Sequence, residues 1–453
     1  MLLSPTVEQI AEVTNGEILS GNSQTECHSV STDTRTLTAG SLYIPLVGER
    51  FDGHEFVSQA TDAGAVAVLT ERPLETEITQ IKVDDTLRAL ADLAAWHRDQ
   101  FSGRVVAVTG SAGKTTVKQL MGSVLAQRYE TLITKGNLNN HIGAPLTLLS
   151  IEPAHQAAMI ELGASGVGEI AYTAELTRPE VGILTNVVPA HLEGFGSIEN
   201  IAQTKGELID SVQADGAVIL NADDRFFSEW VSRAGSKKVI SFGLHQPSDV
   251  YATDIQESLE GSAFILHTPA GSVSLFLSLA GVHNVRNALS VAAASTHLGF
   301  SLAEIKAGLE QATAFSGRLE VCDGINGQTI FNDAYNANPE SFCAAIDVLA
   351  LAQGNKVLVM GDMGELGESA AAMHERVGRY AHDKGIQTLV GTGPLSKHAT
   401  DVFGDNAYWF KTREAVADYV KTTTEAGDTV LIKGSRSAGM DQVVRSLTEE
   451  GEK

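Results

Sequence analysis

The sequence predicts an α/β protein of two or three domains whose sheets are largely parallel. Short β-branched apolar runs, such as 66–69 (VAVL), 105–108 (VVAV) and 357–360 (VLVM), end in turns or glycines. Longer segments of helical period, such as 87–96 and 370–380, alternate with these runs. This alternation is typical of sheets built from strand–helix–strand units. The length of 453 residues is too great for one compact core, which is why we expect more than one domain.

Two domain boundaries are expected, near residues 84 and 315. A polar and acidic stretch at 71–85 ends a first small α/β unit, and the segment 313–317 (TAFSG) precedes a new series of strands and helices. The predicted domains are therefore 1–84, 85–314 and 315–453. Each of them has an ordinary domain size.

The composition is that of an acidic globular protein. Lysine and arginine number 32 and aspartate and glutamate 56, which gives a formal charge of −24. Such a surface argues against an extended binding site for nucleic acid or for an anionic membrane. Cys27, Cys322 and Cys343 are odd in number and far apart, which argues against a disulfide framework or a thiolate zinc site and suits a reducing compartment. No stretch resembles a secretion signal or a membrane span, and we expect a cytoplasmic protein without membrane insertion.

The strongest local signal is a phosphate-binding loop after the strand predicted at 105–108. The segment 109–116 (TGSAGKTT) places a glycine-bearing turn before a helix that begins near Lys114. Unsatisfied N–H groups at such a turn bind anions, the lysine supplies charge to the β- and γ-phosphates, and Thr115 can ligate Mg²⁺. The loop predicts ATP or GTP binding but not the reaction. The residues expected to hold the nucleotide here are Gly110, Ser111, Ala112, Gly113, Lys114, Thr115 and Thr116.

Further polar side chains follow the next predicted strands. Glu161 ends one of them, and a carboxylate at the carboxyl end of a strand beside a phosphate loop is well placed to hold Mg²⁺. His191 follows the segment 185–190 (TNVVPA), and Lys205 lies on the helix after it. Taken alone, a histidine in this position is more often packed or at the surface, and a helix lysine more often reaches water.

Taken in order, these segments closely resemble the Mur ligase family, and the resemblance extends over essentially the whole chain. The downstream segments that carry it are 136–143 (GNLNNHIG), 281–287 (GVHNVRN), 316–320 (SGRLE), 333–339 (DAYNANP), 361–367 (GDMGELG) and 433–436 (KGSR). The resemblance implies an N-terminal UDP-sugar-binding domain, a central P-loop mononucleotide-binding domain and a C-terminal Rossmann-like domain.

The segment 333–339 distinguishes among branches of that family. Its Tyr335-Asn336 form is similar to the branch that adds D-alanyl-D-alanine to a UDP-N-acetylmuramoyl-tripeptide. Ala190 before His191 departs from the Asp-His pair of the earlier-acting sisters, and the Asp-Asn-Pro-Arg motif associated with diaminopimelate addition is absent. The resemblance therefore implies an ATP-dependent ligase of peptidoglycan precursor synthesis, and we expect the chain to be a monomer. In this family the γ-phosphoryl group of ATP activates a carboxylate as an acyl phosphate, which an amine then attacks.

The resemblance also implies roles for individual residues. Lys114, Glu161, His191 and Lys205 match the catalytic set. Thr115 and Glu161 would hold one Mg²⁺, His191 would belong to a second Mg²⁺ site, and Lys205 matches the family's carbamylated lysine. Asn284 and Asn287 look like adenine contacts, and Arg318 and Asp333 look like ATP contacts made as the C-terminal domain closes. The expected substrate contacts are Thr34, Arg35, Arg50, Phe51, Asn137, Asn140, Tyr335 and Asn336.

Some alternatives stay open at this point. A sister amide ligase that adds one amino acid, or extends folate with glutamate, would share most of these motifs. A nucleotide-gated binding module would share the phosphate loop. It would not explain why Glu161, His191 and Lys205 stand at the positions of the family's metal ligands. Lys433 and Arg436 would face either the dipeptide or a phosphate.

Overall fold

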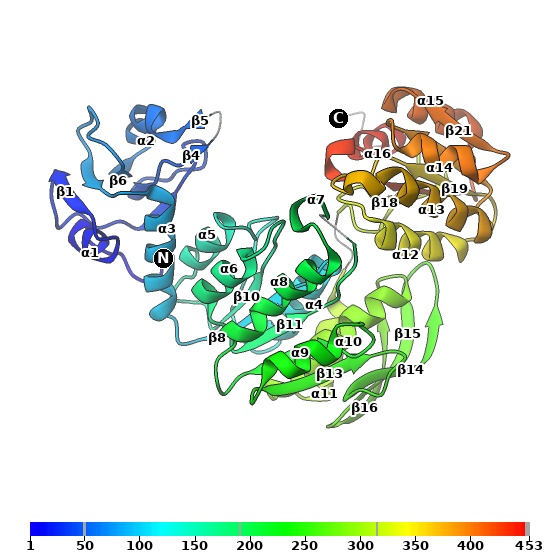
Figure 1. The fold of residues 1–453 in the computed structure, drawn as a ribbon, viewed down its shortest axis with the longest axis horizontal. Coiled ribbons are helices and arrows are strands. Elements are labelled where there is room, and N and C mark those ends of the chain that lie inside the picture. The colour runs from blue at the N-terminus through cyan, green and yellow to red at the C-terminus, as the bar shows by residue number, and fades with distance from the viewer. Residues whose placement is uncertain (49–50, 190–191, 314–315, 449–453) are drawn as a thin grey trace.

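The computed structural model describes residues 1–48, 51–189, 192–313 and 316–448. Three α/β lobes follow one another along the chain, and the central lobe lies between the other two (Figure 1). The predicted three-domain α/β architecture with mostly parallel strands is confirmed. Within the described ranges, no helix combines the length and the apolar character that a membrane crossing requires.

The N-terminal lobe contains a five-stranded sheet in the order β1-β7-β6-β3-β2, in which only β1 and β7 are antiparallel. The stretch 71–85 was expected to be only a polar boundary, but it contains strand β7. Thr79, Gln80 and Ile81 of this strand are all buried. The elements are α1 (Val7–Val13), β1 (Glu17–Ser20), β2 (Ser29–Ser31), β3 (Ser41–Tyr43), β4 (Val47–Gly48), β5 (Phe51–Asp52), α2 (Val57–Asp62), β6 (Ala65–Thr70) and β7 (Thr79–Lys82).

Helix α3 (Thr86–Asp99) connects this lobe to the central one. The Asp85 carboxylate caps the helix by accepting from the backbone N–H groups of its first turn, as N-cap residues do. At the other end the buried Arg98 donates to the backbone oxygens of Thr177 and Arg178 in the central lobe. The helix is therefore attached to the central lobe at its carboxyl end, and it also packs against α1 and β6 of the N-terminal lobe.

The central lobe contains a nine-stranded sheet in the order β16-β15-β14-β13-β12-β11-β8-β10-β9. Strands β8 to β14 are parallel to one another, and β15 and β16 add antiparallel strands at one edge. The strands and helices are β8 (Arg104–Thr109), α4 (Lys114–Leu125), β9 (Thr131–Ile133), α5 (Gly143–Leu149), β10 (Ala157–Glu161), α6 (Glu169–Thr177), β11 (Val181–Leu184), α7 (Leu192–Phe195), α8 (Ile198–Ser211), β12 (Ala217–Asn221), α9 (Phe227–Ala234), β13 (Lys238–Gly243), β14 (Val250–Glu257), β15 (Ser262–Thr268), β16 (Gly271–Leu277), α10 (Val282–His297) and α11 (Leu302–Gln311).

Strand β8 lies inside this sheet and is buried on both faces. Val105 and Ala107 pack into a core with helices α5, α6 and α8, whereas Val106 and Val108 pack into a second core with α4 and α10. Burial on both faces explains the continuous apolar run of the strand. The chain leaves β8 for β9 and β10 on one side and returns to β11 on the other. Such a switch point opens a crevice at the carboxyl ends of the strands, where ligands bind in open α/β sheets.

The C-terminal lobe is a six-stranded sheet in the order β17-β18-β22-β19-β20-β21, antiparallel only at β17. Helices α12, α13 and α14 cover one face, and α15 and α16 cover the other. The elements are β17 (Glu320–Asp323), β18 (Thr329–Asp333), α12 (Pro339–Ala350), β19 (Lys356–Met360), α13 (Ala370–Asp383), β20 (Thr388–Thr392), α14 (Ser396–Phe403), β21 (Ala407–Phe410), α15 (Arg413–Thr423), β22 (Thr429–Lys433) and α16 (Asp441–Leu447).

Candidate functional site

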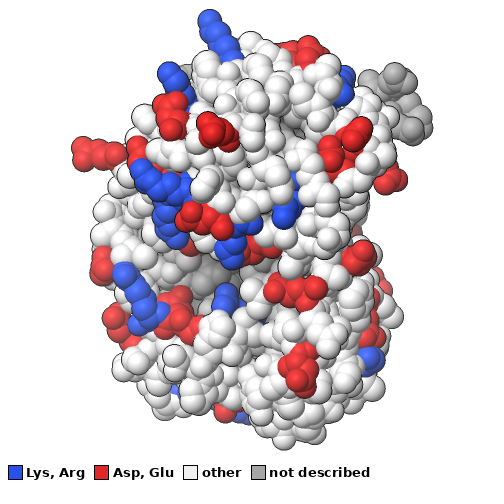
Figure 2. Space-filling model, turned by 90° about the vertical axis from the view of Figure 1, so that its right-hand side faces the viewer, with Lys and Arg blue, Asp and Glu red and all other residues white. Residues whose placement is uncertain are grey.

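A cavity of about 990 Å³ lies between the central and C-terminal lobes. The surface is hollowed between these lobes, and lysine and arginine side chains gather beside the hollow (Figure 2). The predicted site residues that line the cavity are Ser111, Ala112, Gly113, Lys114, Thr115, Thr116, Asn137, Asn140, Glu161, Asn284, Asn287, Arg318, Asp333, Tyr335 and Asn336. Residues from widely separated motifs thus meet in one place.

The phosphate loop joins β8 to α4 in a conformation that needs its two glycines. Gly110 has φ 149° and Gly113, the N-cap of α4, has φ 82°. A Cβ at Gly110 would overlap the Thr185 hydroxyl, and one at Gly113 would lie 2.5 Å from Asn287 Oδ1. Glycine avoids both the strain of positive φ and these collisions. Helix α4 begins at Lys114, where the sequence predicted it.

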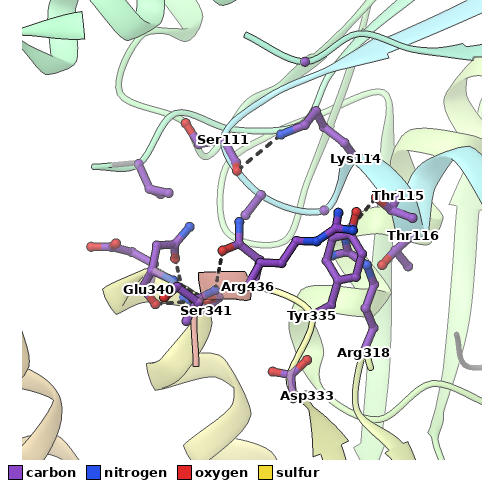
Figure 3. Close-up of a pocket in the computed structure, with 18 of the residues that line it drawn as sticks. Ser111, Lys114, Thr115, Thr116, Arg318, Asp333, Tyr335, Glu340, Ser341 and Arg436 are labelled. Carbon is purple, nitrogen blue, oxygen red and sulfur yellow. Dashed lines mark hydrogen bonds between the residues drawn. The ribbon is translucent and has the colours of Figure 1, made fainter. Parts of the chain in front are cut away.

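Neighbouring strands hold the loop in place. Asn186 accepts from the backbone N–H groups of Ser111 and Ala112 at 2.9 and 3.0 Å, and the Thr185 hydroxyl donates to Ala112 O at 2.6 Å. Both residues follow β11, next to β8 in the sheet. Lys114 Nζ donates to Gly110 O at 2.6 Å, and burial lowers the pKa of this lysine. The loop is therefore preformed, with its lysine folded against it (Figure 3).

Glu161 ends strand β10 beside the loop, as predicted, and is almost fully buried. Asn139 Nδ2 donates to its Oε1 at 2.8 Å, and Lys118 Nζ lies 3.1 Å from its Oε2. Burial raises the pKa of the carboxyl group, but the ammonium groups of Lys118 and Lys114 outweigh burial and hold the pKa below its usual value. Glu161 is therefore an ionised carboxylate at neutral pH, as a Mg²⁺ ligand must be.

Lys205 lies on α8 with only 2% of its surface exposed. Its Nζ donates to Ala164 O at 3.3 Å and lies 5.3 Å from the centre of the Phe195 ring. Burial, and then the charge of Lys114, lower the pKa of Lys205 well below its usual value. Lys205 is therefore buried, unlike most helix lysines, which reach solvent. Among the described residues, no three histidine, cysteine or acidic side chains form a metal-binding cluster, and the predicted ligand His191 lies outside those residues.

The two asparagines expected to contact adenine lie on α10, and Asn287 adjoins Gly113 of the phosphate loop. Asn284 and Asn287 lie one turn apart on α10, where Asn287 Nδ2 donates to Asn284 Oδ1 at 3.2 Å and Asn284 Nδ2 donates to Ala280 O at 2.9 Å. His283 beside them also lines the cavity. Its burial, followed by the charges of Lys433 and Arg286, lowers the pKa of His283 to about 4, so the imidazole is neutral at physiological pH.

The C-terminal lobe contributes a stacked cationic group. The guanidinium of Arg318 lies 4.4 Å from the centre of the Tyr335 ring, and that of Arg436 lies 5.7 Å from it (Figure 3). Arg318 also donates to the Thr115 hydroxyl at 2.9 Å, across the boundary between the lobes. Two guanidinium groups therefore face the phosphate loop, which suits a polyphosphate ligand.

Behind this group lies an ion pair that links two neighbouring strands. Lys433 Nζ lies 2.6 Å from Asp333 Oδ2 and also donates to Asn336 O at 3.0 Å. The side chain of Lys433 is 3% exposed. Lys433 is thus fixed by the segment 333–336, and both Lys433 and Arg436 line the cavity.

The remaining predicted substrate contacts lie elsewhere. Arg35 is exposed and pairs with Asp33 in its own turn. Thr34 is half-buried beside it, and Phe51 in the β4–β5 hairpin is 52% exposed and stacks on Phe56 with ring centres 5.1 Å apart. None of the three lines the cavity. The hairpin lies on the side of the N-terminal lobe that faces the C-terminal lobe (Figure 1). The predicted contact Arg50 lies outside the described residues.

Comparisons with known proteins agree with this arrangement. Family models described as the Mur ligase catalytic, middle and glutamate ligase domains match residues 26–98, 108–295 and 317–436. A protein of Escherichia coli (strain K12) named "UDP-N-acetylmuramoyl-tripeptide--D-alanyl-D-alanine ligase" is 44% identical, over 99% of this chain and 100% of its own. A protein of the same name from Bacillus subtilis (strain 168) is 35% identical, over 99% of both chains.

Solved structures resemble the whole chain as well. A crystal structure of MurF from Acinetobacter baumannii has a TM-score of 0.93 at 38% identity and covers 98% of both chains. A MurF ligase of Thermotoga maritima in complex with ADP has a TM-score of 0.85 at 28% identity, over 94% of this chain and 98% of its own. Sequence, fold and the shared motifs agree, and the chain belongs to the Mur ligase family.

Proposed function

We propose that the chain joins D-alanyl-D-alanine to UDP-N-acetylmuramoyl-tripeptide and converts ATP to ADP and phosphate, a step of peptidoglycan precursor synthesis. The observation that carries this function is the single cavity in which the phosphate loop meets Glu161 and the Tyr335-Asn336 segment. Relatives that match along the whole chain bear the name of this ligase. A nucleotide switch needs only the phosphate loop. In this cavity the loop is accompanied by the carboxylate of Glu161 and by the guanidinium groups of Arg318 and Arg436.

The reaction must overcome the low reactivity of a carboxylate toward amines. Transfer of the γ-phosphoryl group of ATP to the tripeptide carboxylate gives an acyl phosphate. The dipeptide amine then attacks its carbonyl carbon, and phosphate leaves as the amide forms. The first step brings two anions together, so catalysis depends on positioning and charge neutralisation. The groups on the cavity wall that can supply that neutralisation include Lys114, the loop amides, Arg318 and Arg436.

Magnesium fits the residues present. Glu161 is ionised, lines the cavity and follows the strand next to the phosphate loop, and the Thr115 hydroxyl lies at the start of α4. Bound there, Mg²⁺ would neutralise charge on the ATP phosphates. We assign Thr115 and Glu161 to one site, and His191 and a carbamylated Lys205 to a second. A carbamate forms only from a neutral amine, which the buried environment of Lys205 favours, and its oxygens are hard ligands.

We propose the following nucleotide and substrate contacts. ATP would lie along the phosphate loop, with its adenine toward Asn284 and Asn287 and its phosphates toward Arg318 and the Asp333 segment. The muramoyl peptide would approach Asn137 and Asn140, and the dipeptide would approach the Tyr335-Asn336 side. The uridine would stack on Phe51 in the N-terminal lobe, with Thr34 and Arg35 nearby.

We place the domain boundaries near residues 84 and 315, between strand β7, which ends at Lys82, and helix α3, and shortly before strand β17, which begins at Glu320. Phe51 and the cavity lie on different lobes, so a substrate that reaches both requires the N-terminal lobe to approach the others. We further propose that the enzyme acts as a monomer in the cytoplasm, where UDP-linked precursors and ATP are available.

A phosphate-release assay with a panel of UDP-muramoyl peptides and amine acceptors tests this function. Release should require ATP, Mg²⁺, UDP-N-acetylmuramoyl-tripeptide and D-alanyl-D-alanine together. Equal release with single amino acids on shorter precursors would instead identify a sister ligase. Phosphate release that depends on neither the acceptor nor the precursor would identify a nucleotide switch.

A further inference from the structure

A buried lysine behind Glu161 has no part in the scheme above. Lys118 lies one turn after Lys114 on α4, and its side chain is 1% exposed. Its Nζ lies 3.1 Å from Glu161 Oε2 and donates to Gly136 O at 3.2 Å. Glu161 and Asn139 line the cavity, but Lys118 does not. The ammonium therefore contacts the carboxylate from the side away from the cavity.

The carboxylate of Glu161 is held at both oxygens. Asn139 Nδ2 donates to Oε1 at 2.8 Å, and Lys118 forms an ion pair with Oε2, a buried atom that accepts no hydrogen bond from the described residues. The backbone N–H of Glu161 donates to the Thr134 hydroxyl at 3.0 Å. A buried oxygen without a partner is costly, so without Lys118 the carboxylate would turn toward another donor. The hydrogen bond from Nζ to Gly136 O keeps the ammonium in place.

Stability alone does not account for this ion pair, because a buried pair of this kind is often no more stabilising than apolar residues of similar volume. We propose that Lys118 is a positioning residue that holds Glu161 in the orientation in which it meets Mg²⁺. It acts through Glu161 and does not contact the metal or the nucleotide. This inference rests on the proposed role of Glu161 as a Mg²⁺ ligand.

The test measures metal binding separately from turnover. Mn²⁺ is titrated, with electron paramagnetic resonance detecting free Mn²⁺, into the full chain saturated with a non-hydrolysable ATP analogue. Partners that orient a metal ligand change metal affinity about 10- to 100-fold when they are removed, so Lys118→Met should weaken Mn²⁺ binding by at least about tenfold. ADP binding in the presence of EDTA should not change. The matched control is Lys306→Met, which breaks a Lys–Glu pair outside the cavity and should leave Mn²⁺ affinity unchanged.

A double-variant cycle separates positioning from a structural role. If Lys118 acts only through Glu161, the variant with both Lys118→Met and Glu161→Gln should bind Mn²⁺ as weakly as Glu161→Gln alone. The double variant removes both charges of the pair and so leaves no buried charge without a partner. If Lys118→Met alone fails to fold, the double variant can still be compared with Glu161→Gln. Additive losses in the cycle would overturn the inference.

The single variants distinguish the two levels of the proposal. If Glu161→Gln weakens Mn²⁺ binding but Lys118→Met leaves it unchanged or tightens it, the positioning role is wrong while the role of Glu161 stands. If Glu161→Gln binds Mn²⁺ as the unmodified chain does, the proposed metal role of Glu161 is wrong, and the inference is wrong with it.

Discussion

Asp333→Asn should destabilise the C-terminal lobe, because it leaves the ammonium of Lys433 buried without its anionic partner. The two residues are register partners on β18 and β22 and lie 2.6 Å apart, with side chains 12% and 3% exposed. Removing one member of a buried pair costs about 3–5 kcal/mol. We expect about 3 kcal/mol, the lower limit of that range, because Asn336 O still accepts from Lys433. A lobe of about 140 residues has an unfolding entropy of about 0.3 kcal/mol/K, so its melting temperature should fall by about 10 °C.

Differential scanning calorimetry of the nucleotide-free protein measures this change. The control is Asp323→Asn on the edge strand β17, an exposed aspartate of the same lobe, which should alter stability by less than about 0.5 kcal/mol. Combining Asp333→Asn with Lys433→Met removes the unpaired charge and should recover most of the loss. A transition that does not shift in Asp333→Asn, or a double variant no more stable than it, would refute the reasoning.

Three further predictions concern the nucleotide site, the buried lysine and the thiols. Lys114→Ala should lower turnover by about a thousandfold or more with an unchanged melting profile, as phosphate release and calorimetry will establish; near-normal turnover would contradict its role. Lys205→Ala should be folded but nearly inactive, and a short carboxylic acid should restore part of its activity; full activity without the acid would contradict the carbamate. Burial raises the pKa of Cys27 to about 12 and that of Cys343 to about 11, so both should resist thiol reagents while folded. Because the unfolded thiol loses its proton first, above about pH 8.5, the stability that each thiol contributes should fall as pH rises from there toward the folded pKa. Urea unfolding of Cys27→Ala should be less sensitive to alkaline pH than that of the unmodified chain, and equal sensitivity would contradict this.

Much of the fold could be predicted from local pattern. The apolar runs at 66–69, 105–108 and 357–360 became β6, β8 and β19, because a strand inside a parallel sheet is buried on both faces and reads as a continuous apolar run. Strand β7 was missed, since its polar residues Thr79 and Gln80 gave no apolar run around Ile81. Its place in the sheet depends on pairing with β1 and β6, which are distant in the sequence.

The site could be predicted where one short segment carries the chemistry. The phosphate loop and the carboxylate at the end of β10 fall in this class. The contact of Lys118 with Glu161 was missed. The position of Lys118 one turn after Lys114 puts both lysines on one face of the helix, but the spacing does not indicate which residue Lys118 contacts. Contacts made by residues far apart in the chain, such as Arg318 with Thr115, depend on how the lobes meet. Local sequence does not encode that geometry.

The carboxyl group of the muramoyl tripeptide that accepts the dipeptide can be labelled with ¹⁸O to test the proposed chemistry most directly. Phosphoryl transfer to that carboxylate, followed by attack of the dipeptide amine, moves one carboxylate oxygen into the released phosphate. Mass spectrometry should therefore find phosphate that carries one ¹⁸O for each amide formed, with ADP unlabelled. Unlabelled phosphate alongside amide formation, or label in AMP, would contradict the acyl-phosphate route.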